Sequence, residues 1–111
     1  MAKLYFNTAF AIGMVPDGTI TVRTVGDEET AEYLRAGVVE NVANPAHANT
    51  LDAVSRRLGV DVRAAKGGRV SLQSGDEVLV AEIGNVPRET REFTDAEIAA
   101  ATFRFRLIKV R

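Results

Sequence analysis

The sequence contains no cysteine, no tryptophan and only one histidine among its 111 residues. The absence of cysteine excludes disulfide bonds and thiolate metal sites, and a single histidine cannot form a cluster of imidazole ligands. An enzyme of this composition would work without a metal unless carboxylates alone held a hard cation. We therefore expect neither a metal site nor a cofactor.

Long hydrophobic runs are also missing. The N-terminal segment Met1–Phe6 lacks the apolar stretch of a signal peptide, and no segment approaches the length needed to span a bilayer. We therefore expect no membrane association and a cytoplasmic location.

Neither sign of charge dominates the chain. The 14 Lys and Arg residues nearly balance the 15 Asp and Glu residues, giving a formal net charge of −1. This balance gives no general attraction to polyanions, so we expect no duplex nucleic acid partner. The last quarter is nevertheless basic, which leaves room for a local anion site: Arg88, Arg91, Arg104, Arg106, Lys109 and Arg111.

The length and composition indicate one globular domain over residues 1–111, with 46% hydrophobic and 26% charged residues. Strands and helices are mixed without strict βαβ alternation, which predicts an α+β domain with a mixed β-sheet flanked by helices. The expected strands are Leu4–Phe6, Thr19–Arg23, Val38–Val42 and Thr102–Val110. The expected helices are Glu28–Ala36, one over Asn49–Leu58 and a short one opened by a capping box at Thr94–Glu97. The cap of the second helix is either Asn49 or Asn44, with Pro45 as the first helical residue.

The middle of the chain predicts a β-hairpin. Arg69–Leu72 and Glu77–Ile83 flank the turn residues Ser74–Asp76. In such a tight turn Asp76 and Glu77 are expected to be solvated. On the last strand, Phe103, Phe105 and Leu107 alternate onto one face and are expected in the core. Arg56 and Arg57 are expected to point outward from the second helix.

His47 is the first candidate for acid–base chemistry, because histidine titrates near neutral pH. It precedes a predicted helix whose first polar residues, Asn49 and Thr50, lie where free backbone N–H groups favour an anion such as phosphate. The alternative is a solvated or capping histidine in a loop. Arg69 begins a predicted strand after Gly67 and Gly68, where its guanidinium either holds a phosphate or forms a surface salt bridge.

The order and spacing of several short segments resemble the viral anti-CRISPR ring nucleases that degrade cyclic tetra-adenylate, and their relatives in archaeal viruses, prophages and bacteria. The resemblance covers nearly the whole chain. The segments that carry it are Phe6–Phe10, Val42–Thr50, Leu58–Val60, Gly68–Val70, Ser74–Asp76 and Thr94–Glu97.

The resemblance implies a homodimer that binds a cyclic oligonucleotide across its two-fold axis. It implies metal-independent cleavage, in which a ribose 2′-OH attacks the adjacent phosphorus and leaves a 2′,3′-cyclic phosphate, with His47 as general acid. The substrate-binding positions that it suggests are Asn7, Thr8, Ala11, Asn49, Thr50, Arg69 and Asn85. A virus- or prophage-encoded protein of this kind would act in the host cytoplasm, against nucleotide-signalled antiviral defence.

The loop Asn85–Glu92 departs from the family pattern, in which an Arg-Leu-x-Glu-Gly run follows the hairpin. Here the arginine is displaced to Arg88, beside Glu89. We predict that Arg88 stabilises phosphate charge during cleavage, with Glu89 orienting it or the attacking ribose; the alternative is a solvated charged loop. The displaced arginine also motivates a second hypothesis, a non-catalytic protein that sequesters a cyclic nucleotide. A third is an interaction module in which His47 has no role.

Overall fold

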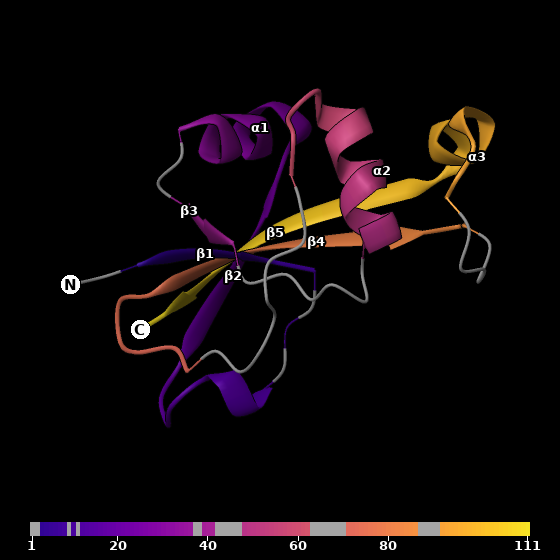
Figure 1. Cartoon of the computed structure of the whole chain (residues 1–111). Coiled ribbons are helices and arrows are strands. Elements are labelled where there is room, and N and C mark those ends of the chain that lie inside the picture. Colours follow the sequence, from indigo (N-terminus) through magenta and orange to yellow (C-terminus); the bar gives the residue numbers. More distant parts are fainter. Residues whose placement is uncertain are drawn as a thin grey trace.

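A computed structural model describes residues 3–8, 10, 12–36, 39–41, 48–62, 71–86 and 92–111 of the chain. Within these ranges, a five-stranded mixed sheet carries three α-helices on one face and the short 3₁₀ helix η1 on the other (Figure 1). The expected α+β fold is confirmed. The elements are β1 Leu4–Asn7, η1 Ile12–Met14, β2 Ile20–Val25, α1 Asp27–Arg35, β3 Val39–Asn41, α2 Ala48–Leu58, β4 Glu77–Gly84, α3 Asp95–Ala100 and β5 Thr102–Val110.

The strand order of the sheet is β2-β5-β4-β1-β3. β1 lies parallel to both β3 and β4, whereas β5 lies antiparallel to both β4 and β2. β4 is therefore the central strand, with a parallel neighbour on one side and an antiparallel neighbour on the other. Its near-continuous apolar run fits this position, because Val78, Leu79, Val80 and Ala81 are all buried.

The expected hairpin of Arg69–Leu72 and Glu77–Ile83 is wrong. Residues 69 and 70 lie outside the described part of the chain, and residues 71–73 form no strand. Leu72 instead donates its backbone N–H to the carbonyl oxygen of Met14 at 2.7 Å. Over Glu77–Val80 both edges of β4 are taken, by β1 and by β5, so no edge remains for a hairpin partner.

Asp76 is buried, at 4% exposure, which corrects the expectation of a solvated turn residue. Its carboxylate accepts the backbone N–H of Lys3 at 3.0 Å and that of Gln73 at 2.9 Å. The side chain thus joins the start of β1 to the turn that leads into β4. Glu77 is half-buried at the start of β4. Asp76 is buried because the turn lies where β4 begins beside β1. At this point the backbone N–H groups of Lys3 and Gln73 need an acceptor, and the Asp76 carboxylate provides it.

Alternation along the strands divides the core between the two faces of the sheet. Phe105 and Leu107 pack with Leu79 beneath α1 and α2, and Phe103 is partly buried against the same cluster, as its spacing predicted. The opposite face carries a second cluster beside η1: Leu72, Val78, Val80, Ile108 and Val110, with Phe10 and Met14 packed against it.

The helices follow their local signals closely. The predicted capping box is confirmed: Thr94 Oγ1 accepts from the Glu97 N–H, and the Glu97 carboxylate accepts from the Thr94 N–H. The α1 boundaries fall within one residue of prediction, and α2 covers the expected Asn49–Leu58. The alternative cap at Asn44 lies outside the described residues. Arg57 points outward, donates to Asp27 Oδ2 at 2.8 Å and lies 4.8 Å from the centroid of the Phe103 ring.

Candidate functional site

The end of β1 creates an opening in the sheet. Asn7, the last residue of β1, pairs with Val80, and its side-chain Oδ1 accepts the Thr8 N–H at 2.8 Å. This local turn takes the chain out of the sheet. β4 continues to Gly84, and among the described strands none pairs with β4 on this side beyond Val80. The edge of β4 from Ala81 onward is therefore free of a described strand partner.

The first turn of α2 lies near this opening. The helix begins at Ala48 and contacts β4. The first N–H groups of a helix lack partners within it, and they form the positive end of the helix dipole. The first turn of α2 contains no acidic residue that would offset this positive character. The geometry favours an anion at the start of α2.

A pocket of about 310 Å³ joins these two features. It is lined by Thr8, Thr50, Ala81, Glu82 and Ile83. Thr8 and Thr50, which the family resemblance suggested as substrate-binding, therefore share one pocket although they come from different elements. Their hydroxyl groups can donate to or accept from a ligand, and the apolar Ala81 and Ile83 limit the space beside them.

The other described candidates do not line this pocket. Asn7 is buried, at 7% exposure, and holds the turn after β1. Asn49 is half-buried in the first turn of α2. Asn85 has a left-handed backbone, with φ 58°, and its Nδ2 donates to the carbonyl oxygen of Ala100 at 2.9 Å, which links the end of β4 to the end of α3.

Five candidates lie outside the described residues: Ala11, His47, Arg69, Arg88 and Glu89. Their assigned roles therefore stay predictions. His47 directly precedes Ala48, the first residue of α2, in the sequence.

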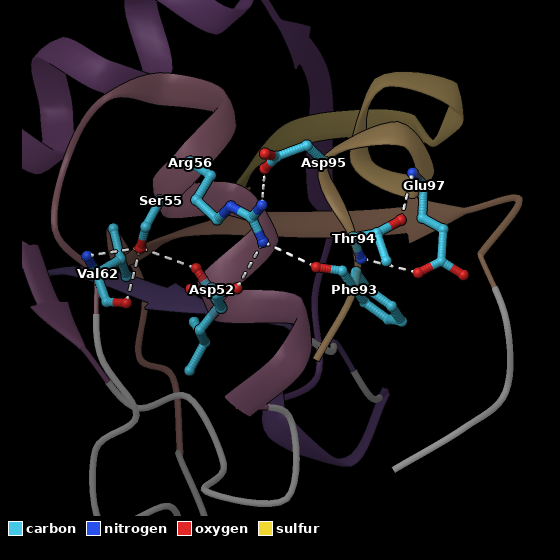
Figure 2. A network of polar contacts seen from close by, with 9 residues as sticks. Asp52, Ser55, Arg56, Val62, Phe93, Thr94, Asp95 and Glu97 are labelled. Carbon is cyan, nitrogen blue, oxygen red and sulfur yellow. Dashed lines mark hydrogen bonds and ion pairs between the residues drawn. The ribbon is translucent and has the colours of Figure 1, made fainter. Parts of the chain in front are cut away.

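A network of polar contacts joins α2 to the segment that enters α3 (Figure 2). Arg56 Nη1 donates to the Phe93 carbonyl oxygen at 2.9 Å and to Asp52 Oδ2 at 3.3 Å, and Nη2 pairs with Asp95. On the same helix, Ser55 Oγ accepts the Val62 N–H at 2.9 Å. Arg56 is exposed, as expected, and its guanidinium also links α2 to the segment that enters α3.

The sequence did not reveal the contribution of β4 to the pocket. Ala81, Glu82 and Ile83 carry no motif, and they line the pocket only because β1 ends before β4 does. No local signal in the sequence encodes this difference in strand length, which depends on the parallel register of β1 and β4.

Neither a metal cluster nor a membrane span is found in the described part of the chain. The described residues contain no group of three or more His, Cys, Asp or Glu side chains that could hold a metal ion. Likewise, none of the described helices has both the length and the apolar character to cross a bilayer.

Comparison with known proteins identifies a similar fold but no family. The sequence matches neither a protein-family model nor a curated protein. Among solved structures, the chain is similar to B116 of Sulfolobus turreted icosahedral virus, with a TM-score of 0.75 and 23% sequence identity. The match covers 97% of this chain and 99% of that one, so the fold is shared with a viral protein over essentially its full length.

Proposed function

We propose that the protein is a metal-independent ring nuclease that binds a cyclic oligoadenylate, with cyclic tetra-adenylate favoured, and cleaves it. The observation that carries this proposal is the pocket that unites Thr8 and Thr50 at the positive end of α2. The resemblance to the ring nucleases suggested both residues as substrate-binding. The same helix start directly follows His47, the candidate general acid.

In this reaction the protein has to align the ribose 2′-OH with the phosphorus, neutralise the phosphate charge and protonate the departing 5′-oxygen. The ribose 2′-OH attacks the neighbouring phosphorus and gives up its proton to solvent water, the bond between phosphorus and the 5′-oxygen breaks, and a 2′,3′-cyclic phosphate remains. The N–H groups of the first turn of α2 and the Thr50 hydroxyl would hold the phosphate, and His47 would donate the proton to the departing 5′-oxygen. Arg69 and Arg88 would add positive charge, and Glu89 would orient Arg88 or the ribose.

The active unit in this proposal is a homodimer, because a ring with two-fold symmetry is matched by two identical sites around one axis. The shared fold with a viral protein supports an origin in a virus or prophage. The protein would then degrade a signal of antiviral defence in the cytoplasm of the host. Light scattering at micromolar concentration tests the assembly, and a monomer would remove the two-fold site.

The activity is tested by incubating the protein with cyclic tri-, tetra- and hexa-adenylate in EDTA and identifying products by mass spectrometry. Linear fragments ending in 2′,3′-cyclic phosphate are expected. His47→Ala should lower the single-turnover rate by about a hundredfold or more if His47 is the general acid. Partial recovery with added imidazole would separate this role from a structural one. An unchanged rate in His47→Ala contradicts the assignment.

The second candidate function is sequestration of the cyclic nucleotide without cleavage, favoured by the displacement of Arg88 relative to the family pattern. Heat denaturation of the complex distinguishes the two functions. A sequestering protein releases the intact ring, whereas a nuclease releases linear fragments. An interaction module unrelated to nucleotides would show no thermal shift with any of the three rings.

A further inference from the structure

A second hollow lies on the other face of the sheet, away from α1 and α2. Its volume is about 430 Å³. It is lined by Phe10, Val22, Val80, Glu82, Arg106 and Ile108, which we call the sheet groove. Val80 and Ile108, both nearly fully buried, form its apolar floor, and Val22 of the edge strand β2 is 53% exposed beside them.

Two opposite charges project beside this apolar floor. Arg106 pairs with Val80 across β4 and β5, and Glu82 follows Val80 by two residues, so the two side chains share one face and lie diagonally across adjacent strands. In the described part of the chain, Glu82 and Arg106 make no hydrogen bond or ion pair, and neither does Arg104, which lies directly opposite Glu82.

This combination selects a class of ligand. A carboxylate accepts hydrogen bonds, a guanidinium donates them, and here both stand over a surface that suits a flat apolar face. Phe10 adds an aromatic ring, and a volume of about 430 Å³ is in the usual range of small-ligand pockets. A purine base fits these features. Its edge carries an amino or ring N–H group next to a ring nitrogen or oxygen that accepts a hydrogen bond, and its two fused rings form a flat apolar face.

We propose that the sheet groove is a binding site for a purine base. Glu82 accepts from the amino or ring N–H of the base, Arg106 donates to the neighbouring acceptor, and the two rings cover Val80 and Ile108. The site goes beyond the proposed nuclease activity and does not depend on it, since the groove lies on the face opposite α2. The groove and the α2 pocket meet at β4, where Glu82 lines both.

The test uses the full-length protein with isotope-labelled Val and Ile methyl groups, titrated with adenosine, guanosine and cytidine, none of which has a cleavable phosphodiester. We expect saturable shifts of the Val22, Val80 and Ile108 methyl signals with at least one purine nucleoside, and at least fivefold weaker binding of cytidine. Failure of both purines to shift these signals would overturn the proposal. Shifts that depend on protein concentration alone would overturn it in favour of a second copy of the chain on this face.

Paired variants separate recognition from general charge effects. Glu82→Gln and Arg106→Gln should each weaken purine binding by fivefold or more. The controls Glu77→Gln and Lys109→Gln remove the same charges from the same two strands, but at positions that alternate onto the other face, and they should leave binding unchanged. Equal losses in the control and groove variants would contradict specific recognition. Because the readout is binding of a nucleoside, failure here is distinct from failure of ring cleavage.

Discussion

Arg56 Nη1 of α2 donates to the backbone carbonyl oxygen of Phe93 at 2.9 Å, although the two residues are 37 positions apart in the sequence. The same guanidinium pairs with Asp95 at the start of α3, and Phe93 itself is buried at 7% exposure (Figure 2). One side chain therefore fixes the orientation of α2 relative to the segment that enters α3.

Replacement of Arg56 should loosen this junction. We expect Arg56→Met to lower the free energy of unfolding by about 1–2 kcal/mol, because it removes a charge-assisted bond to a backbone carbonyl while keeping much of the apolar stem; partial solvent exposure limits the loss. Urea denaturation measures it. Arg104→Met, an exposed arginine without a hydrogen bond or ion pair among the described residues, is the control. Equal stability of the two variants would show that the junction does not depend on Arg56.

Asp76 should be among the most sensitive polar positions. Asp76→Ala would leave the N–H groups of Lys3 and Gln73 without their acceptor, at a cost of about 2–4 kcal/mol in unfolding free energy. Asp76→Asn retains one carbonyl oxygen and should cost roughly half as much. The exposed turn residue Asp17 provides the comparison, since Asp17→Ala should change stability very little. Denaturation midpoints that do not separate Asp76→Ala from Asp17→Ala would refute this reasoning.

The capping box should contribute to α3 even though the helix is short. Thr94→Ala removes the acceptor for the Glu97 N–H, and we expect a loss of about 1 kcal/mol in unfolding free energy. Thr94→Ser keeps the hydroxyl and should retain most of the stability. Thermal denaturation of the two variants in parallel is the measurement, and identical melting temperatures would rule out the cap as a source of stability.

The ion pair between Arg23 and Glu29 should show in the acid titration. The hydrogen bond that Arg23 donates lowers the pKa of Glu29 below its ordinary value of 4.5, and the positive charge of Arg23 lowers it further. A carboxyl group with a lowered pKa stabilises the fold fully above its unfolded pKa, and this contribution disappears as the pH falls through the folded pKa. The small stability difference between the wild-type protein and Glu29→Gln should therefore vanish in acid.

Carboxyl NMR measures the Glu29 titration directly. In the Arg23→Gln variant the Glu29 midpoint should rise toward its ordinary value, and high salt should have a similar effect on the wild-type protein, because water and ions reach both partly exposed side chains. A midpoint that is insensitive to both changes would exclude the ion pair in solution.

Thr50 tests the pocket itself. Thr50→Val keeps the shape of the side chain but removes its hydroxyl, so we expect binding of cyclic tetra-adenylate to weaken about five- to tenfold. Isothermal titration calorimetry is done on a His47→Ala background, because the proposed mechanism requires His47 for cleavage and its removal would keep the ring intact during the measurement. Thr21→Val, an exposed threonine of β2 outside the pocket, should bind normally. Equal affinity of the two variants would remove Thr50 from the site.

Local signals in the sequence predicted several elements well. The Thr94–Glu97 box marks the start of α3 because its two hydrogen bonds lie within four residues of each other. The alternation of Phe103, Phe105 and Leu107 assigns the faces of β5, since successive side chains of a strand point to opposite sides. The helical spacing of Leu51, Val54 and Leu58 likewise matches the face that α2 buries.

The sequence by itself therefore determined where most elements form, which face of each is apolar and which residues are candidates for chemistry. Only the tertiary structure decided that β4 pairs with β1 and β5 instead of forming a hairpin, that Asp76 is buried, and that Thr8 and Thr50 meet beside β4. The period of a strand specifies its faces but not its neighbours. Neighbours are chosen by contacts between segments far apart in the chain, whose energies no local pattern records.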